Sequence, residues 1–136
     1  MMPAGKYYIG DLCYVMTDEE WDEFCKLTIV DYDCVHGEFT FADGRRFATY
    51  GTKWGDGLYQ SNINTKHSVD AGLIGCFLVE DIKAEKYDDI ESLGAIVTFE
   101  KDFKTYENDG LIVFGHVIIN TDPDEYYDEE EDYEYE

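Results

Sequence analysis

The chain has 136 residues, with 32 Asp and Glu against 10 Lys and Arg and a formal net charge of −22, and its length suits one domain with its own core. Nucleic acids and anionic membranes are bound mainly through Lys and Arg, so the charge argues against both and favours basic protein surfaces, including those of nucleic-acid-binding proteins. Aromatic residues make up 16% of the chain and Pro occurs only twice, which favours strands over a helical bundle.

The N-terminal segment is expected to form two strands and then the one convincing helix of the chain. Residues 6–16 are rich in Tyr, Ile, Leu and Val and are interrupted by a Gly-Asp pair, which predicts strand, break and strand. Thr17-Asp-Glu-Glu20 is a capping box, in which each of the two outer side chains accepts a hydrogen bond from the backbone N–H of the other residue. Apolar residues spaced three and four apart from Trp21 onward predict a short amphipathic helix near residues 17–27.

Two β-hairpins are predicted from their turn residues. Residues 39–50 place aromatic side chains on both sides of Asp43-Gly44, a pair typical of a two-residue type I′ turn. Residues 103–119 are predicted to form a second hairpin, which turns at Asn108-Asp-Gly110.

The segment between the two hairpins is predicted to supply the centre of the sheet. Residues 67–80 contain a nearly continuous apolar run, which is typical of a strand covered on both faces. Gly72 and Gly75 within this run predict a bulge or the close approach of another backbone. Residues 95–100 are expected to form a further strand, and the polar residues 81–93 are expected to be irregular.

About eight short strands and one helix predict a mainly β fold, a single-domain antiparallel β-sandwich or partly open barrel over residues 1–120. Residues 121–136 are predicted to be a disordered acidic tail, because they carry ten carboxylates and no Lys or Arg. The densest charge of this tail lies at Asp128, Glu129, Glu130, Glu131 and Asp132. We expect the tail to act as a mobile arm that seeks basic partners, although the 22 acidic and 10 basic residues before it leave the body acidic as well, with a balance of −12.

Four motifs follow one another along the body: Tyr8-Ile-Gly-Asp-Leu-Cys-Tyr-Val15, Gly55-Asp-Gly-Leu-Tyr59, Val69-Asp-Ala-Gly-Leu-Ile-Gly75 and Phe114-Gly-His-Val-Ile-Ile-Asn-Thr121. With a Trp-bearing helix after the first motif, the chain resembles a group of small uncharacterised β-rich proteins of bacteria, bacteriophages and large DNA viruses. The resemblance covers residues 5–121 and omits the tail. It implies a common small β-rich fold and a phage or viral source, it brings no catalytic residue with it, and it places any shared function in the body.

Three Gly-Asp elements of the body are candidates for a functional site. Asp11, Asp56 and Asp70 each stand beside a glycine at or near the expected end of a strand. If they converge, their carboxylates could bind Mg²⁺ or Ca²⁺ or act as acid and base. The alternative is a turn and scaffold role, in which each side chain accepts from a neighbouring backbone N–H.

The other candidate residues are aromatic or imidazole side chains. Trp54 and Tyr59 could line a concave mouth near the glycine-rich loop, or they could plug one end of the core. His67 or His116 would form a nucleophilic pair if the fold placed it beside the thiol of Cys13 or Cys76. Cys34 and His36 lie two residues apart, which would suit two ligands of a transition metal on one face of a strand. No second pair at a recognised spacing completes a zinc site and no cofactor motif is present, so neither a metal nor a cofactor is predicted.

These observations favour a non-enzymatic acidic binding protein, including a phage or viral inhibitor that docks on the basic surface of a nucleic-acid-binding protein. The alternatives are a small enzyme or small-ligand binder built on the Gly-Asp loops, and a minor structural or assembly protein. We expect a cytoplasmic location, or the host cytoplasm or nucleus for a viral protein, because no signal-like N-terminus and no apolar run of transmembrane length are seen.

Overall fold

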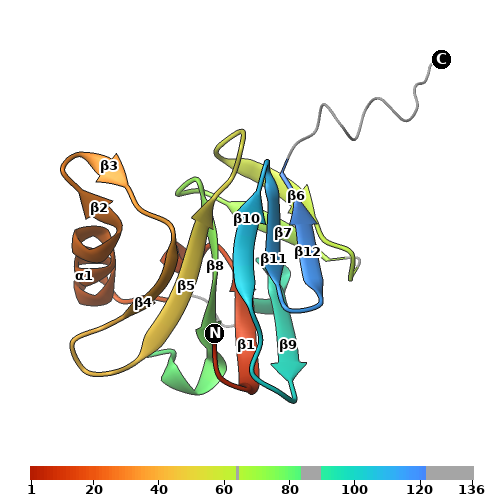
Figure 1. Ribbon diagram of the computed structural model, residues 1–136, viewed down its shortest axis with the longest axis horizontal. Helices are drawn as coiled ribbons and strands as arrows, with labels where there is room; N and C mark the ends of the chain where they lie inside the picture. Colours follow the sequence, from red (N-terminus) through yellow and green to blue (C-terminus); the bar gives the residue numbers. More distant parts are fainter. Residues whose placement is uncertain (64, 84–89, 122–136) are drawn as a thin grey trace.

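A five-stranded antiparallel sheet forms the centre of the protein in the computed structural model, which describes residues 1–63, 65–83 and 90–121 (Figure 1). The strand order of this main sheet is β4 (Gly37–Thr40), β5 (Arg46–Gly51), β8 (Leu73–Leu78), β1 (Gly5–Gly10) and β9 (Ala95–Phe99). The predicted tail, apart from Thr121, lies outside the described residues, and so do its residues Asp128–Asp132.

Smaller β elements and one helix complete the fold. A three-stranded antiparallel sheet contains β10 (Thr105–Asn108), β11 (Leu111–Phe114) and β12 (Val117–Asn120), and two-stranded sheets are formed by β6 (Gly57–Gln60) with β7 (Lys66–Val69) and by β2 (Ile29–Val30) with β3 (Asp33–Cys34). The helices are α1 (Asp18–Thr28) and the 3₁₀ turns η1 (Leu12–Tyr14), η2 (Val79–Asp81) and η3 (Ile90–Ser92). The antiparallel sheets are not closed into a barrel, and the predicted mainly β single-domain class is confirmed.

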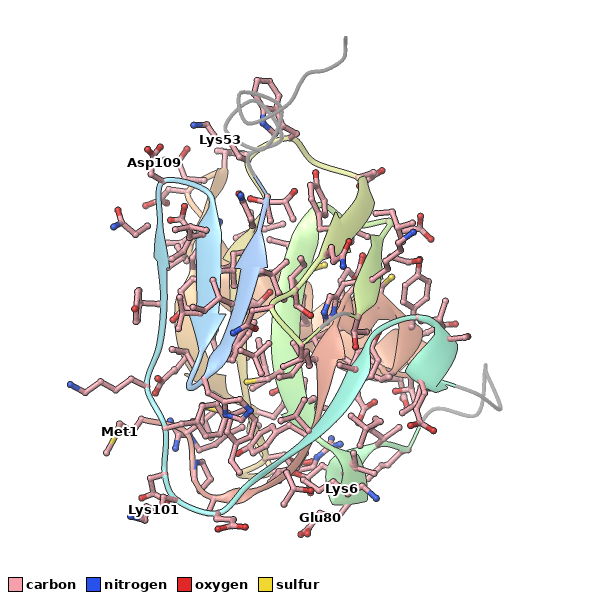
Figure 2. All side chains as sticks on the ribbon, turned by 90° about the vertical axis from the view of Figure 1, so that its right-hand side faces the viewer. Met1, Lys6, Lys53, Glu80, Lys101 and Asp109 are labelled. Atoms are coloured by element: carbon pink, nitrogen blue, oxygen red, sulfur yellow. The ribbon has the colours of Figure 1, made fainter. Side chains whose placement is uncertain are left out.

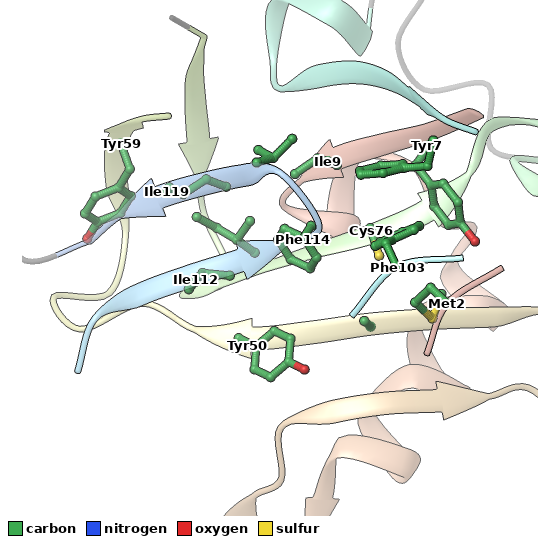
Figure 3. Close-up of a cluster of buried hydrophobic side chains, with 14 of the residues drawn as sticks. Met2, Tyr7, Ile9, Tyr50, Tyr59, Cys76, Phe103, Ile112, Phe114 and Ile119 are labelled. Atoms are coloured by element: carbon green, nitrogen blue, oxygen red, sulfur yellow. The ribbon is translucent and has the colours of Figure 1, made fainter. Parts of the chain in front are cut away.

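The main sheet buries apolar side chains on both faces, because successive residues of a strand point to opposite sides. Tyr7 and Ile9 of β1 pack into a cluster with residues of β11, β12, β6 and β7, part of which is shown in Figure 3. Tyr8, between them, packs on the opposite face with residues of η1 and α1. In Figure 1, α1 with β2 and β3 accordingly lies on one side of the main sheet and β10–β12 on the other. Coverage of both faces explains the nearly continuous apolar runs of the central strands.

Helix α1 begins as its sequence predicts. The backbone N–H of Glu20 donates to the Thr17 side chain (3.1 Å) and that of Thr17 donates to the Glu20 carboxylate (2.8 Å). The apolar face of the helix packs on the main sheet through stacked rings, with centroid distances of 4.4 Å between Trp21 and Phe24 and 5.0 Å between Phe24 and Phe47. Burial of this face supplies the stability that an isolated eleven-residue helix lacks.

The central strand β8 is shorter than the apolar run that contains it. The run divides at the turn before Gly72, whose φ of 74° lies in the left-handed region, so the segment from 67 belongs to β7 and pairs with β6. The expectation for Gly75 is confirmed, because a Cβ atom there would lie 2.3 Å from the carbonyl oxygen of Ala48 on β5. The expected second strand of residues 6–16 is wrong, since Asp11 caps η1 instead.

The two predicted turns differ in type. At the turn between β10 and β11, Asp109 and Gly110 both have positive φ (52° and 91°), as a type I′ turn requires. Between β4 and β5 only Gly44 does (97°), while its N–H donates to the Phe41 carbonyl oxygen at 2.9 Å. This is a type I turn followed by a glycine bulge, and the predicted type I′ turn there is wrong. Gly115 (φ 59°) adds a second turn that makes the expected second hairpin a three-stranded meander.

Candidate functional site

Asp11 lies at the end of β1 and is completely buried. Its Oδ1 accepts a hydrogen bond from the backbone N–H of Cys13 (3.0 Å). Its Oδ2 accepts from the backbone N–H groups of Asp70 and Ala71, both at 2.7 Å. The carboxylate therefore joins the start of η1 to the turn between β7 and β8. Backbone donors occupy both of its oxygens, which is a scaffold role.

Asp70 shares this turn but directs its side chain to a different partner. The Tyr14 hydroxyl donates to Asp70 Oδ2 at 2.5 Å. Burial and this bond to a carboxylate both raise the pKa of Tyr14, so the phenol stays protonated and acts as the donor. The Asp70 side chain itself is exposed, and its bond to Tyr14 ties the turn to η1 from the outside.

The third Gly-Asp element also reaches this end of the main sheet. Thr52 links the loop after β5 to the Asp70 turn, because its backbone N–H donates to the Gly72 carbonyl oxygen (3.0 Å) and its hydroxyl to that of Gly55 (2.6 Å). A Cβ atom at Gly72 would lie 3.9 Å from Asp56 Oδ1. The structure thus brings together the loops of all three predicted aspartates. Within residues 1–63, 65–83 and 90–121, however, no group of three His, Cys, Asp or Glu side chains is arranged to hold a metal ion.

Tyr59 and His67 face each other across the β6–β7 pair and are both buried. The Tyr59 hydroxyl donates to the Gly55 carbonyl oxygen at 2.9 Å, so this ring belongs to the core and steadies the loop. His67 donates through Nδ1 to the Ile9 carbonyl oxygen at 3.0 Å, while burial lowers its pKa. Its Nε2 has no hydrogen-bond partner within the described part of the chain. Trp54, in contrast, has 53% of its surface exposed.

Of the two candidate thiols, Cys76 lies in surroundings that do not suit a nucleophile. Cys76 is completely buried on β8, and burial raises the pKa of its thiol, the opposite of what a nucleophile needs. Cys13 donates its backbone N–H to Asp11 at the start of η1. The exposed ring of His116 packs on Phe99, with the ring centroids 5.3 Å apart.

A strongly acidic region lies on the α1 side of the molecule. We call residues 17–36, which comprise α1 and the β2–β3 hairpin, the acidic lobe. It carries one basic residue, Lys26, and seven carboxylates: Asp18, Glu19, Glu20, Asp22, Glu23, Asp31 and Asp33. Glu20 is buried in an ion pair with Arg45, whereas Glu19, Asp22, Asp31 and Asp33 are exposed. The lobe therefore presents concentrated negative charge to solvent.

Other lysines than Lys26 lie outside the acidic lobe. Figure 2 shows Lys53 at one end and Lys6 and Lys101 at the other, in a view that places the acidic lobe on the far side. Lys53 is paired with Asp109 at 3.2 Å. Arg46 binds Glu38 at 3.1 Å, so part of the positive charge of the body is already balanced within it.

A shallow pocket opens beside the meander. It has a volume of about 380 Å³ and is lined by residues 98–103 with Gly115 and His116. Phe99 and Phe103 stack in its wall with centroids 3.8 Å apart, and Asp102 already accepts from the backbone N–H of Ala4 at 3.0 Å. The charges around this pocket are of both signs, which gives it no evident preference for a ligand.

The β2–β3 hairpin is the part of the acidic lobe that the sequence interpretation missed. Its turn residues, Asp31 and Tyr32, both have positive φ (53° and 69°). Two β-branched residues, Ile29 and Val30, directly follow the helix and are separated from β3 by two residues, which is a spacing that indicates a hairpin. The absence of Gly or Asn in the turn removed the usual signal.

Comparison with known proteins identified no relative from which a function could be transferred: no family model, curated protein or solved structure matches the chain. In the described part of the chain, no helix has the length and apolar character needed to cross a membrane.

Proposed function

We propose that this protein is a non-enzymatic binding protein that docks through its acidic surface on a basic protein partner. The observation that carries the proposal is the concentration of seven carboxylates against one lysine in the acidic lobe. Such a field attracts a positively charged partner, speeds association and orients the encounter. The balance of −12 outside residues 122–136 means that the body carries this field without the tail.

The partner class that we favour is a nucleic-acid-binding protein. The phosphate-binding surface of such a protein is built from Lys and Arg, which neutralise the closely spaced phosphates of a nucleic acid. Closely spaced carboxylates carry the same negative charge as those phosphates and can bind the same surface. The resemblance to phage and viral proteins extends the proposal to an inhibitor that covers such a surface in a host enzyme. The occupied carboxylate of Asp11 makes a catalytic use of the Gly-Asp loops the weaker alternative.

Capture from cell lysate tests the proposal. We expect the immobilised protein to retain proteins with a pI above about 9 at about 50 mM NaCl and to release them at about 500 mM, where screening is strong. A variant of the acidic lobe carries three changes together, Glu19→Gln, Asp22→Asn and Asp33→Asn. The amount of basic protein that this variant retains should fall by about tenfold or more.

The matched control removes the same number of charges elsewhere, at exposed Glu80, Glu91 and Glu100, each changed to Gln. Capture by this control should remain close to that of the unchanged protein. An equal loss in both variants would reject the acidic lobe as the docking region, and retention that is insensitive to salt would reject the proposed function altogether.

A further inference from the structure

The β2–β3 hairpin projects from the acidic lobe with its apolar side chains uncovered. Ile29 and Val30 point to opposite faces of this short ribbon, yet 48% and 50% of their surfaces are exposed. Tyr32 at the tip is fully exposed, at 101%, and Val35 after β3 is 40% exposed. Neither face of the hairpin is therefore covered by the main sheet, and Figure 1 shows the hairpin at the outer edge of the molecule.

The tip is also in a conformation that its residues do not favour. A type I′ turn needs positive φ at both central positions, where Gly, Asn and Asp are usual and a bulky aromatic residue is an outlier. Tyr32 has a φ of 69° here. Folding alone would be served better by glycine at this position, so the local structure gives no reason for the ring.

We propose that the β2–β3 hairpin is a docking element that inserts Tyr32 into an apolar pocket ringed by Lys and Arg on a partner protein. This inference rests on the proposed function and names the part of the surface that makes the contact. Tyrosine is among the residues that most often dominate binding at interface centres, because its large ring is amphipathic and loses little conformational freedom. A short hairpin further limits the backbone freedom of Tyr32 before the partner arrives.

The negative charge around Tyr32 determines which kind of partner the hairpin can bind. Asp31 and Asp33 flank Tyr32 directly, and exposed Glu19 and Asp22 lie on α1 in the same lobe. A second copy of this chain has the same strongly negative net charge, so it would be repelled, as would an anionic membrane or a nucleic acid. A pocket with a basic rim pairs these carboxylates while its apolar floor receives the ring.

The test uses two variants of the full chain that separate binding from folding. Tyr32→Gly removes the ring and places in the turn the residue that best tolerates positive φ, so the fold should be retained. Tyr106→Thr is the control, since Tyr106 is another tyrosine with 52% exposure, on β10, and threonine suits a strand.

The partner is found with a photoreactive probe and then purified. A benzophenone amino acid replaces Tyr32 in one preparation and Tyr106 in another, and cross-linked proteins from lysate are identified by mass spectrometry. We expect the probe at position 32, and not that at 106, to cross-link a basic protein beside an apolar pocket with Lys or Arg at its rim. With that purified protein, Tyr32→Gly should raise the Kd at least tenfold, and Tyr106→Thr should leave it within twofold.

The outcomes separate this inference from the proposed function. Equal cross-linking at both positions, no cross-link at 32, or an unchanged Kd for Tyr32→Gly would overturn the docking role of the hairpin while salt-sensitive capture would still uphold a basic partner. Cross-links between two copies of this chain would overturn the inference, because they would show that the hairpin contacts a second copy and not a basic partner. Capture that does not respond to salt would overturn both proposals together.

Discussion

Asp11, a candidate catalytic residue in the sequence, serves in the structure to hold backbone segments in place. Its carboxylate is completely buried and accepts hydrogen bonds from three backbone N–H groups, two of them at positions 70 and 71. One bond caps η1 and the other two reach the turn between β7 and β8, so the carboxylate fixes the position of these two segments. A buried ion is tolerable when such donors replace its lost hydration.

We expect Asp11→Ala to lower the free energy of unfolding by about 3–5 kcal/mol, because it leaves buried N–H groups without an acceptor. Asp70→Ala removes the bond from Tyr14 and should cost about 1–2 kcal/mol. Urea denaturation monitored by tryptophan fluorescence gives both values. A fully stable Asp11→Ala protein with lost partner binding would instead make Asp11 a site residue.

His67 provides a second prediction at the residue scale, through pH. Burial lowers its pKa in the folded protein below the ordinary value of about 6.5. Above that pH His67 is neutral in both the folded and the unfolded protein, so its titration does not lower the free energy of unfolding. As the pH falls below the ordinary value, the unfolded chain takes up a proton that the folded chain refuses, and the free energy of unfolding decreases.

The measurement is the urea midpoint between about pH 7.5 and about pH 5.5, a range above the usual titration of carboxylates. His67→Asn should flatten the pH dependence, since an asparagine amide can still donate to the Ile9 carbonyl oxygen but does not titrate. His116→Asn, at an exposed position, should leave the slope as it was. A slope that is the same in all three proteins would remove His67 as its source.

At the scale of elements, Glu20 fastens α1 to the main sheet. One carboxylate oxygen accepts the Thr17 N–H within the capping box, and the other pairs with Arg45, whose guanidinium lies over the rings of Phe41 and Phe77 at 5.2 and 5.9 Å. Arg45 also donates to the Asp81 carbonyl oxygen at 3.1 Å. A helix cap and a tertiary contact thus depend on the same side chain.

Glu20→Gln should reduce the free energy of unfolding by about 1–3 kcal/mol, because Arg45 loses its buried counter-charge and keeps only the exposed carboxylate of Asp43 (2.8 Å), while the capping acceptor remains. Glu19→Gln on the exposed side of the same helix turn should change it by less than about 0.5 kcal/mol. Thermal and urea unfolding of the pair provide the comparison. Equal effects would mean that net charge, and not the ion pair, governs the stability of α1.

At the scale of the whole molecule, negative charge works against compactness. The formal charge of −22 repels itself within the folded protein, and salt screens this repulsion. The body ends in a specific contact before the acidic run starts. Thr121 is completely buried, donates to the Gly110 carbonyl oxygen (2.6 Å) and accepts from the Lys53 N–H (3.0 Å).

We therefore expect NaCl between about 50 and 500 mM to raise the melting temperature, and to raise it less after residues 122–136 are deleted. At the higher salt concentration the deletion should change the free energy of unfolding by less than about 1 kcal/mol. Thr121→Ala should lower the free energy of unfolding by about 1–3 kcal/mol, since it removes two side-chain hydrogen bonds, one of them buried. Loss of folding after the deletion alone would contradict this division between body and tail.

The sequence by itself determined the features that depend on neighbours along the chain. The capping box of Thr17 and Glu20, the alternation that defines the strands and the type I′ turn at Asp109-Gly110 all arise from side chains acting within a few residues of one another. The net charge was likewise readable from composition, and our proposal of a basic partner rests on it.

Only the tertiary structure decided what depends on residues far apart in the sequence. Asp11 and Asp70 are 59 positions apart, so no local pattern could show that the side chain of one holds the backbone of the other. The turn at Asp43-Gly44 takes its shape from the pairing of the strands that flank it, and Gly72 separates two strands because they pair with different partners. The sequence also could not show that the β2–β3 hairpin is exposed. Its apolar residues remain uncovered because the hairpin lies beyond the main sheet in the folded protein.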